Sequence, residues 1–396
     1  MSIYSLEGFH VGLVTENPIT TLGGVERFSL SLAQELKQRG ARISIYNRSL
    51  LTGFKSHWYD RYGIGMARRT WALGLVVADI AKRDRVDVII QNGISGWSLR
   101  HAAPEVPRIV VHHGTWRGVA PHLLKPSSPV RTRLANRVFT SWLSGGIERW
   151  TAATAKSVAV SLAVAEELRE LYGIDASVVQ NGIDLEHFIP IDRQEARKKL
   201  GLRIPPGQII ISFTGRLEYR KGADILYELS RRAAEETPEA VFLLAVDRAP
   251  QGWPSNVVAL ENVSYERMPL VYSASDVFVF PSRYEGCSYS VIEAMACGVP
   301  PILSNVGHAK DIREQDKILG EFIIDELSPD VFWTVLTRLI REPQQRQTLG
   351  TLARRYAEEH NSLKAMGDAY QKLICETISS HKALMEAKQS NARSHV

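Results

Sequence analysis

Residues 284–300 read YEGCSYSVIEAMACGVP and place two carboxylates, Glu285 and Glu293, with seven residues between them. A short apolar run at 277–281 precedes this stretch and is typical of a buried strand, and the apolar spacing after it is helical up to the closing Gly-Val-Pro. The segment therefore predicts a strand, a loop that carries Glu285 and a helix that carries Glu293. The amides of Cys287 to Ser290 would lie at the helix N-terminus, where backbone N–H groups bind phosphate oxygens.

Each carboxylate also has a structural interpretation. Ser290-Val291-Ile292-Glu293 has the pattern of a capping box, in which Glu293 folds back to a backbone amide at the start of its helix. Glu285 precedes Gly286 in a loop, where an acid is either solvated or hydrogen-bonded to ligand hydroxyls. No structural task for Glu285 is visible in the sequence, so we expect the function to depend on it more than on Glu293.

Short apolar runs alternate with helical patterns along both halves of the chain. Such alternation predicts parallel sheets covered by helices, in which ligands bind at the carboxyl ends of the strands. We take the charge-rich, proline-containing stretch 189–207 as the interdomain region, and expect helices only after Asp330. The predicted strands are 10–15, 43–46, 86–90 and 109–111 in the first half, and 209–213, 240–245, 257–260, 277–280 and 301–303 in the second.

Size and composition limit the class of protein. A chain of 396 residues is long enough for two domains. Although 44% of the residues are hydrophobic, no uninterrupted apolar run approaches the roughly 18 residues of a membrane span, and the N-terminus lacks a signal-peptide pattern. Three cysteines without metal-ligand or disulfide spacing favour a reducing compartment, so we expect a cytoplasmic protein.

The formal net charge of +5 suggests an anionic partner. Basic residues cluster in Lys125–Arg149, where arginines alternate with apolar side chains in the pattern of a basic amphipathic helix. Two interpretations stay open: a surface helix packed on its own domain, or a face that docks on a membrane. Nucleic-acid binding is not expected, because no motif of that class accompanies the charge.

Three more motifs follow predicted strands. Gly23-Gly24 lies between a strand and a helix, where it forms either a plain turn or a close backbone approach to phosphate. The stretch 213–222 carries three cations, of which Arg216 and Lys221 are spaced to reach a diphosphate leaving group, and a solvated basic loop is the alternative. His112 and His113 follow the strand 109–111, where one histidine of such a pair usually has a structural role and the other can face a cleft.

Asn181-Gly182-Ile183-Asp184 is a turn signal, to which we assign a hinge. The sequence has no Asp-x-Asp pair and no histidine cluster, so no catalytic metal is expected. Gly23-Gly24 is not a full dinucleotide fingerprint, so no nicotinamide cofactor is expected either.

In this order along the chain, the motifs resemble those of family 4 of the retaining glycosyltransferases, and the resemblance covers most of the sequence. It implies an α/β fold of GT-B architecture, with two facing Rossmann-like domains, parallel sheets and a C-terminal helix that returns to the first domain. The implied boundaries are 1–190 for the acceptor-side domain, 191–365 for the donor-side domain and 366–396 for the returning helix and tail.

The resemblance also implies roles for individual residues. Glu285 would contact sugar hydroxyls of the donor and Glu293 its ribose, Arg216 and Lys221 would hold the diphosphate, and His113 would lie beside the transferred sugar. The remaining donor contacts would come from the phosphate cradle, which consists of Gly23, Gly24, Gly286, Cys287, Ser288, Tyr289 and Ser290. The chain departs from the family pattern at 246–248, at Cys287-Ser288 and at 307–311, which concerns donor identity more than activity.

The resulting hypothesis is a retaining, metal-independent hexosyltransferase that uses a UDP- or GDP-linked sugar and no cofactor, in polysaccharide, lipopolysaccharide or glycolipid assembly. The acceptor is a hydroxyl, for which a lipid-linked sugar is one candidate if Lys125–Arg149 contacts the inner face of the membrane. Two alternatives remain: a sugar-nucleotide 2-epimerase of the same architecture, and a non-catalytic subunit that binds sugar nucleotide or membrane.

Overall fold

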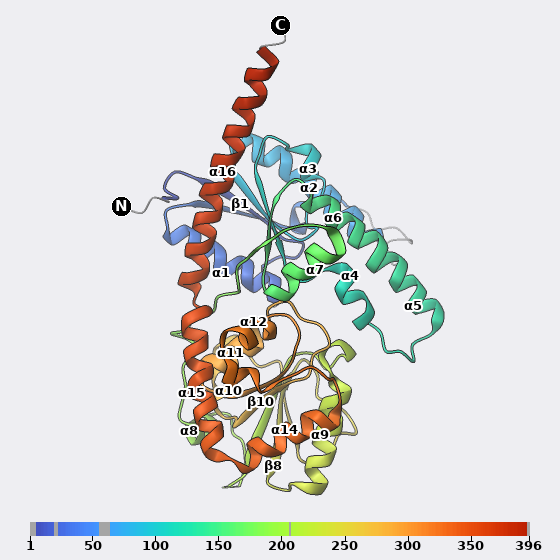
Figure 1. The fold of residues 1–396 in the computed structure, drawn as a ribbon, viewed down its shortest axis with the longest axis vertical. Coiled ribbons are helices and arrows are strands. Elements are labelled where there is room, and N and C mark those ends of the chain that lie inside the picture. The colour runs from blue at the N-terminus through green and yellow to red at the C-terminus, as the bar shows by residue number, and fades with distance from the viewer. Residues whose placement is uncertain (1–4, 20–22, 55–63, 206, 394–396) are drawn as a thin grey trace. The chain divides into compact units, whose positions relative to one another are not determined.

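The computed structural model describes residues 5–19, 23–54, 64–205 and 207–393, the side chains only up to 388, and divides into two compact units (Figure 1). The first unit comprises Met1–Pro121, Ser128–Gly182 and Leu363–Val396, and the second comprises His122–Ser127 and Ile183–Ser362. Each unit contains one parallel six-stranded sheet with helices packed against it. The α/β class predicted from the sequence is confirmed.

The sheet of the first unit has the order β2-β1-β3-β4-β5-β6. Each of the four predicted strands is present within two residues of its expected bounds, because an apolar run flanked by polar residues marks a buried parallel strand. The strands β5 and β6 were not predicted, since β6 has two residues and β5 begins with a charged one. The bounds are β1 (His10–Val14), β2 (Arg42–Tyr46), β3 (Val88–Asn92), β4 (Arg108–His112), β5 (Lys156–Ala159) and β6 (Ser177–Val178).

Helices cover this sheet with apolar faces. Phe28 and Leu32 of α1 and Val77 of α2 are fully buried. Removing apolar surface from water stabilises the fold by about 25 cal/mol per Å². The longer helices are α1 (Gly24–Gln38), α2 (Ile64–Arg83), α6 (Gly145–Ala152), α7 (Leu162–Tyr172) and α16 (Leu363–Arg393), with short helices α3 (Leu99–Ala102) and α4 (Trp116–Val119) between strands.

The basic region 125–149 is not one regular helix as predicted. It contains α5 (Val130–Asn136), then π-helical turns over Arg137–Ser144 (the π segment), then the start of α6. The π geometry is seen in backbone hydrogen bonds from residue i to residue i−5, such as that from Gly145 N–H to Thr140 O, and the Ser144 hydroxyl also donates to Phe139 O at 3.0 Å. Two glycines at 145 and 146 follow this segment.

The second sheet has the order β12-β11-β10-β7-β8-β9, and β12 is a two-residue strand that was not predicted. The stretch 189–207 does not form an interdomain region as expected. Its charged residues form α8 (Arg193–Lys199), in which Arg197 donates to the buried Asp276 at 2.7 Å, so the stretch belongs to the second unit. The strands are β7 (Ile209–Thr214), β8 (Ala240–Val246), β9 (Val257–Glu261), β10 (Val277–Phe280), β11 (Pro301–Ser304) and β12 (Ile323–Ile324).

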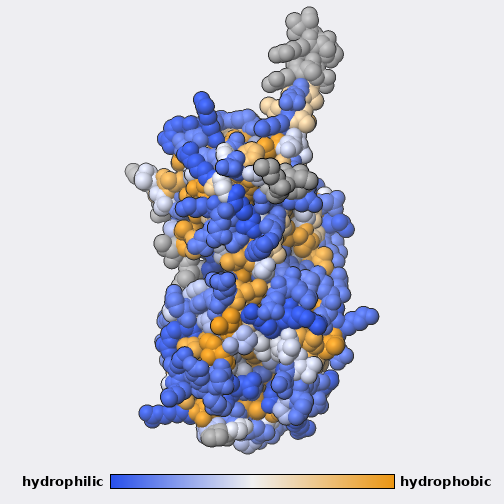
Figure 2. All heavy atoms as spheres, turned by 90° about the vertical axis from the view of Figure 1, so that its left-hand side faces the viewer, coloured by the Kyte–Doolittle hydropathy of each residue, from blue (hydrophilic) through white to orange (hydrophobic). Residues whose placement is uncertain are grey.

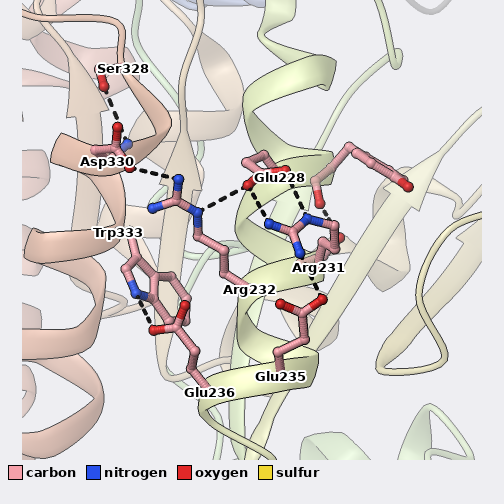
Figure 3. A network of polar contacts seen from close by, with 10 residues as sticks. Glu228, Arg231, Arg232, Glu235, Glu236, Ser328, Asp330 and Trp333 are labelled. Atoms are coloured by element: carbon pink, nitrogen blue, oxygen red, sulfur yellow. Dashed lines mark hydrogen bonds and ion pairs between the residues drawn. The ribbon is translucent and has the colours of Figure 1, made fainter.

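Two helices of the second unit are joined by a polar network (Figure 3). Arg232 of α9 pairs with Asp330 of α14 at 2.6 Å and with Glu228 of its own helix at 3.0 Å. Because Arg231 also donates to Glu228, the pKa of this carboxyl falls to about 2. The other helices of this unit are α9 (Ala223–Glu236), α10 (Met268–Ser273), α11 (Tyr289–Ala296), α12 (Ala309–Gln315), α13 (Lys317–Gly320), α14 (Pro329–Arg341) and α15 (Pro343–His360).

The chain passes from the first unit to the second between Gly182 and Ile183, within the predicted Asn-Gly-Ile-Asp turn, and returns after Ser362. The Ile183 N–H donates to Asn361 O at 2.8 Å, so these two crossing points lie side by side in the second unit. After the return, α16 packs against α1, where Arg39 pairs with Asp368 at 2.9 Å.

The face in Figure 2 is mostly hydrophilic, with hydrophobic residues in scattered patches. Among the described residues, no helix is both long and apolar enough to cross a bilayer.

Candidate functional site

The candidate donor site lies where the strand order of the second sheet reverses. The parallel neighbours β7 and β10 continue to opposite sides of the sheet, β7 toward β8 and β10 toward β11. In such sheets, ligands bind at the carboxyl ends of the two strands that flank this point. Two loops meet there, residues 215–222 after β7 and 281–288 after β10, and the Arg283 N–H donates to Arg220 O at 2.7 Å across them.

Glu285 lies in the second loop and pairs with two cations of the first. Its Oε1 lies 2.7 Å from Lys221 Nζ and 3.2 Å from Arg220 Nη1, and the Glu285 side chain is 11% exposed. Arg220 also donates to Tyr284 O at 3.0 Å. The expectation that Glu285 has no structural task is therefore wrong, because its carboxylate joins the two loops.

Arg220 was missed as a site residue. The spacing of the cations indicated Arg216 and Lys221, but the Arg216 side chain is 64% exposed and pairs with Glu218 at 3.0 Å. Arg220 and Lys221 belong to the same 3-10 turn, Tyr219–Lys221, which turns both side chains toward Glu285. The signal for this turn is Gly222, whose φ of +73° ends it in a left-handed conformation.

The Glu285 loop is so closely approached by its neighbours that glycine is required at one position in each of two adjoining loops. A Cβ atom at Gly222 would overlap the carbonyl oxygen of Pro281, and one at Gly307, which has a φ of +56°, would overlap those of Glu285 and Gly286. The neighbouring His308 N–H donates to Gly286 O at 2.8 Å. The loop after β11 therefore supports the Glu285 loop from its other side.

The helix after Glu285 begins earlier than the capping box predicted. Its N-cap is Ser288, which makes no side-chain cap bond, and Ser290 lies within α11. The capping-box interpretation is therefore wrong, because the helix start is shifted by two residues. Glu293 instead accepts from Tyr272 OH at 2.7 Å and is 2% exposed. The Ser288 side chain therefore does not cap the first-turn amides of α11.

His308 is a second residue near the site that no sequence motif indicated. It is 2% exposed, its Nε2 has no hydrogen-bond partner among the described residues, and burial lowers its pKa to about 4. With Glu285, Ser288 and Phe280 it lines a cavity of about 10 Å³, which is the size of one water molecule. A neutral imidazole therefore lies directly under the Glu285 loop.

In the first unit, His113 follows β4 and is held in one tautomer. The Asn92 amide donates to Val14 O at 3.1 Å and to Ser29 Oγ at 3.0 Å, so its Oδ1 must accept from His113 Nε2, 2.8 Å away. Burial lowers the pKa of His113 to about 3, so the ring is neutral at neutral pH. Nε2 therefore carries the proton, and Nδ1 is an acceptor.

The glycine pair of the first unit begins a helix as predicted. Gly23 is the N-cap of α1, without a side-chain cap bond, and Gly24 is its first residue. A Cβ atom at Gly23 would overlap the carboxylate of Glu26, which accepts from Asn17 at 3.0 Å. Residues 20–22 before the pair lie outside the described part of the chain. Within that part, no group of three or more His, Cys, Asp or Glu side chains could hold a metal ion.

Two family models match successive parts of this chain. Residues 22–187 match glycosyltransferase family 4, and residues 192–356 match the group 1 glycosyl transferases. The chain belongs to the family 4 glycosyltransferases. This result confirms the resemblance that the order of motifs predicted.

Relatives with assigned names are similar to part of the chain. A D-inositol 3-phosphate glycosyltransferase of Rhodococcus erythropolis is 30% identical over 234 residues, which cover 54% of this chain and 52% of the relative. A glycogen synthase of Geotalea daltonii is 30% identical over 202 residues, which cover 43% and 41%. The chain thus spans about half the length of the curated relatives it matches.

Solved structures share the fold over nearly the whole chain. Sucrose-phosphate synthase from Thermosynechococcus elongatus superimposes with a TM-score of 0.74 at 19% identity, covering 94% of this chain and all of that one. WaaG, a glycosyltransferase involved in lipopolysaccharide biosynthesis, gives 0.68 at 16% identity and covers 92% and 99%. The GT-B architecture of this family 4 glycosyltransferase is therefore confirmed.

Proposed function

We propose that this protein is a retaining hexosyltransferase that moves a sugar from a UDP- or GDP-linked donor to an acceptor hydroxyl without a metal ion. The observation that carries the proposal is the ion-paired cluster of Glu285, Lys221 and Arg220 at the switch point of the second sheet. Residues 22–187 and 192–356 match glycosyltransferase models, which supports transfer over other reactions of a nucleotide sugar.

The charges of the cluster suit a diphosphate. Arg216, Arg220 and Lys221 carry three positive charges against two negative ones on Glu218 and Glu285, which leaves one net positive charge. The N-terminus of α11 adds about half a positive charge. When the bond from sugar to phosphate breaks, negative charge grows on the leaving oxygen, and cations already held in place stabilise it.

Glu285 has one oxygen left for the donor. Lys221 and Arg220 both pair with Oε1, and no described residue pairs with Oε2. We assign Oε2 to accept hydrogen bonds from the sugar hydroxyls, and assign His113 Nδ1 the same role toward the transferred sugar. Glu293, with Tyr272 as its partner, is assigned to the ribose.

Retention follows if the acceptor attacks the face from which the diphosphate leaves. The bond between the anomeric carbon and the phosphate oxygen breaks, the acceptor oxygen forms the new bond, and the leaving phosphate takes the acceptor's proton. No carboxylate nucleophile takes part in this step.

Turnover of Glu285→Gln and Lys221→Ala tests the assignment. With a panel of UDP- and GDP-sugars, we expect each variant to lose about 100-fold or more in turnover, because each disturbs charge that stabilises the leaving group. Glu239→Gln, an exposed glutamate before β8, is the control and should keep the wild-type rate. NMR of the product should show a retained anomeric configuration, unchanged by a metal chelator.

Other outcomes would contradict parts of the proposal. Wild-type rates in both variants would refute the site, and an inverted product would refute retention. An epimerised donor formed without acceptor would identify the epimerase alternative. Donor binding without turnover across the acceptor panel would identify the non-catalytic one.

We also propose that the basic region 125–149 docks on an anionic bilayer, which supplies a lipid-linked acceptor. In α5 and the π segment, every fourth residue is apolar and exposed. These four are Val130 (70% exposed), Leu134 (61%), Val138 (42%) and Trp142 (73%). Solvent-exposed apolar side chains of this size on one element are typical of an interaction surface.

The π segment keeps this apolar stripe on one face. In an α-helix, a four-residue step advances by about 40° beyond a full turn, whereas in a π-helix of about 4.4 residues per turn it falls short by about 33°. The angular offset between successive apolar residues therefore changes sign from α5 to the π segment, and Val138 and Trp142 remain on the same face as Val130 and Leu134.

Charge favours an anionic surface as the partner. Between Glu105 and Glu148 the sequence contains no acidic residue. The exposed Arg131, Arg133 and Arg137 lie beside the stripe, and each cation near an anionic membrane contributes about 1 kcal/mol.

Vesicle sedimentation tests the docking. Wild-type protein should sediment with anionic vesicles in a salt-sensitive manner and not with neutral ones. Trp142→Ser should weaken binding, whereas Trp71→Ser, which removes a 44% exposed tryptophan from α2, should leave it unchanged. Equal sedimentation of the two variants, or no salt-sensitive binding, would refute docking while leaving the proposed transfer reaction untouched.

A further inference from the structure

The first unit contains a cavity of about 760 Å³ at the amino edge of its sheet. Arg108, the first residue of β4, and Lys156, the first residue of β5, line it together with α16. Because all strands of this sheet are parallel, their amino ends meet at one edge. His113 follows the other end of β4, so this cavity is separate from the candidate donor-binding residues of the first unit.

Arg108 is a buried cation without a carboxylate partner. It is 6% exposed and donates to two neutral oxygens, Gln91 Oε1 at 3.3 Å and Thr154 Oγ1 at 2.9 Å. Burial and the nearby Arg100 lower its pKa to about 10, so the guanidinium is still charged at neutral pH. A buried charge that lacks a counter-ion is costly, and within the described residues none is supplied to Arg108.

The rest of the lining adds to this imbalance. Arg100, Lys156 and Lys388 also line the cavity, so four cations with Arg108 face a single carboxylate, that of Glu376. Glu376 itself lies 3.9 Å from Lys372 Nζ. Lys156 is exposed and has no ion pair among the described residues.

Arg100 is already oriented in the cavity wall. It donates to Trp150 O at 2.6 Å, and its guanidinium carbon lies 4.6 Å from the centroid of the Trp150 ring. A planar guanidinium that is oriented in advance binds phosphate oxygens with little further loss of side-chain entropy. Val106 on one side and Leu384 and Met385 of α16 on the other form the apolar part of the wall, beside the polar Thr377, Ser380 and His381.

From this geometry we infer a second ligand site, in which Arg108, Arg100 and Lys156 bind the phosphate of a phosphate monoester and the apolar wall contacts its organic part. The ligand supplies the counter-charge that Arg108 lacks within the protein. Both a soluble phosphorylated metabolite and a lipid phosphate have this chemistry. The site is independent of the proposed transfer reaction, because none of its residues belongs to the candidate donor site.

Isothermal titration on Lys221→Ala protein tests the inference, because that variant weakens the donor phosphate site and leaves the cavity intact. The probes are inorganic phosphate, glycerol 3-phosphate and dihexanoyl phosphatidate. We expect saturable binding of at least one probe. In a double variant with Lys156→Ala its affinity should fall about tenfold, since a charge-assisted contact is lost. Lys37→Ala, an exposed lysine of α1, serves as the control and should bind as the parent does.

Arg108→Gln, which keeps hydrogen-bonding capacity and removes the charge, should abolish binding. Tighter binding of the phosphatidate than of glycerol 3-phosphate would support the site and indicate a lipid, and equal binding would support it and indicate a soluble metabolite. The inference is overturned if no probe binds, or if Lys156→Ala and Lys37→Ala bind with equal affinity. Because Lys156 is exposed, its substitution should not unfold the protein.

Discussion

Gly222→Ala tests whether the contact between the two site loops is as close as the structure shows. Gly222 has a φ of +73°, and a Cβ atom there would overlap Pro281 O. Gly201 provides a matched control in the same unit, since its φ is +70° and no atom lies within 4 Å of the corresponding Cβ position. Both substitutions place alanine in the left-handed region, but only Gly222→Ala adds a collision with a backbone oxygen.

The expected costs follow from these two terms. A left-handed backbone conformation destabilises an L-residue by about 1–2 kcal/mol. Alanine also lowers the conformational entropy of the unfolded chain, which stabilises the folded protein by about 0.4–1 kcal/mol. We therefore expect Gly201→Ala to lose about 1 kcal/mol. Overpacking against backbone adds about 1–3 kcal/mol, so Gly222→Ala should lose about 3 kcal/mol. For a domain of this size, the melting temperature should fall by about 2–4 °C in Gly201→Ala and by about 6–12 °C in Gly222→Ala.

Calorimetry of the whole chain is the assay, with the transition of the second unit followed in both variants. The same displacement would move Lys221, which precedes Gly222, away from Glu285, so Gly222→Ala should also lose donor binding while Gly201→Ala keeps it. Equal losses of stability in the two variants would refute the close contact. Unchanged donor binding in Gly222→Ala would show that the loops do not need this spacing.

Three further outcomes are expected. Stability should fall as the pH drops from about 6.5 to about 4. The pKa values of His113 and His308 lie near 3 and 4 in the folded protein, so the unfolded chain binds more protons than the folded one over this range. The melting temperature of His308→Gln should therefore fall less than that of the wild type between these pH values. Tyr272→Phe should destabilise the protein by about 1–3 kcal/mol in urea, because the buried Glu293 carboxylate loses a donor. Arg232→Ala should destabilise it less than Tyr272→Phe does, since its partner Asp330 is 76% exposed, and a larger effect would refute this ranking.

Short apolar runs made most of the strands predictable. The runs that form β1, β4 and β10 are short, apolar and flanked by polar residues, so their bounds could be predicted within one or two residues. The strand β6 has only two residues, and such a strand exists through its pairing with β5 rather than through local preference. Tertiary pairing of that kind leaves no periodic signal in the sequence.

The candidate site was predictable in its residue types and less so in its contacts. Both glutamates and Lys221 lie where the motif order indicated, at a strand-to-helix turn. The choice of Arg220 over Arg216 depends on the 3-10 turn that Gly222 ends, and that turn is stabilised by a loop about 60 residues further along the chain. The helix begins after the N-cap Ser288, two residues before the N-cap that the local capping pattern predicted.

The contacts around Glu285 hold the backbone of its loop in place from two sides. Lys221 and Arg220 hold Oε1 from one side, and the His308 N–H holds Gly286 O from the other, at a distance that only glycine at 307 allows. The position of the carboxylate is therefore set by three separate loops before any ligand binds. A leaving group gains most from charges that need no reorganisation during the reaction. In the reaction that we propose, Glu285 would act mainly by fixing Lys221 and Arg220, and its Oε2, with which no described residue pairs, would recognise the sugar.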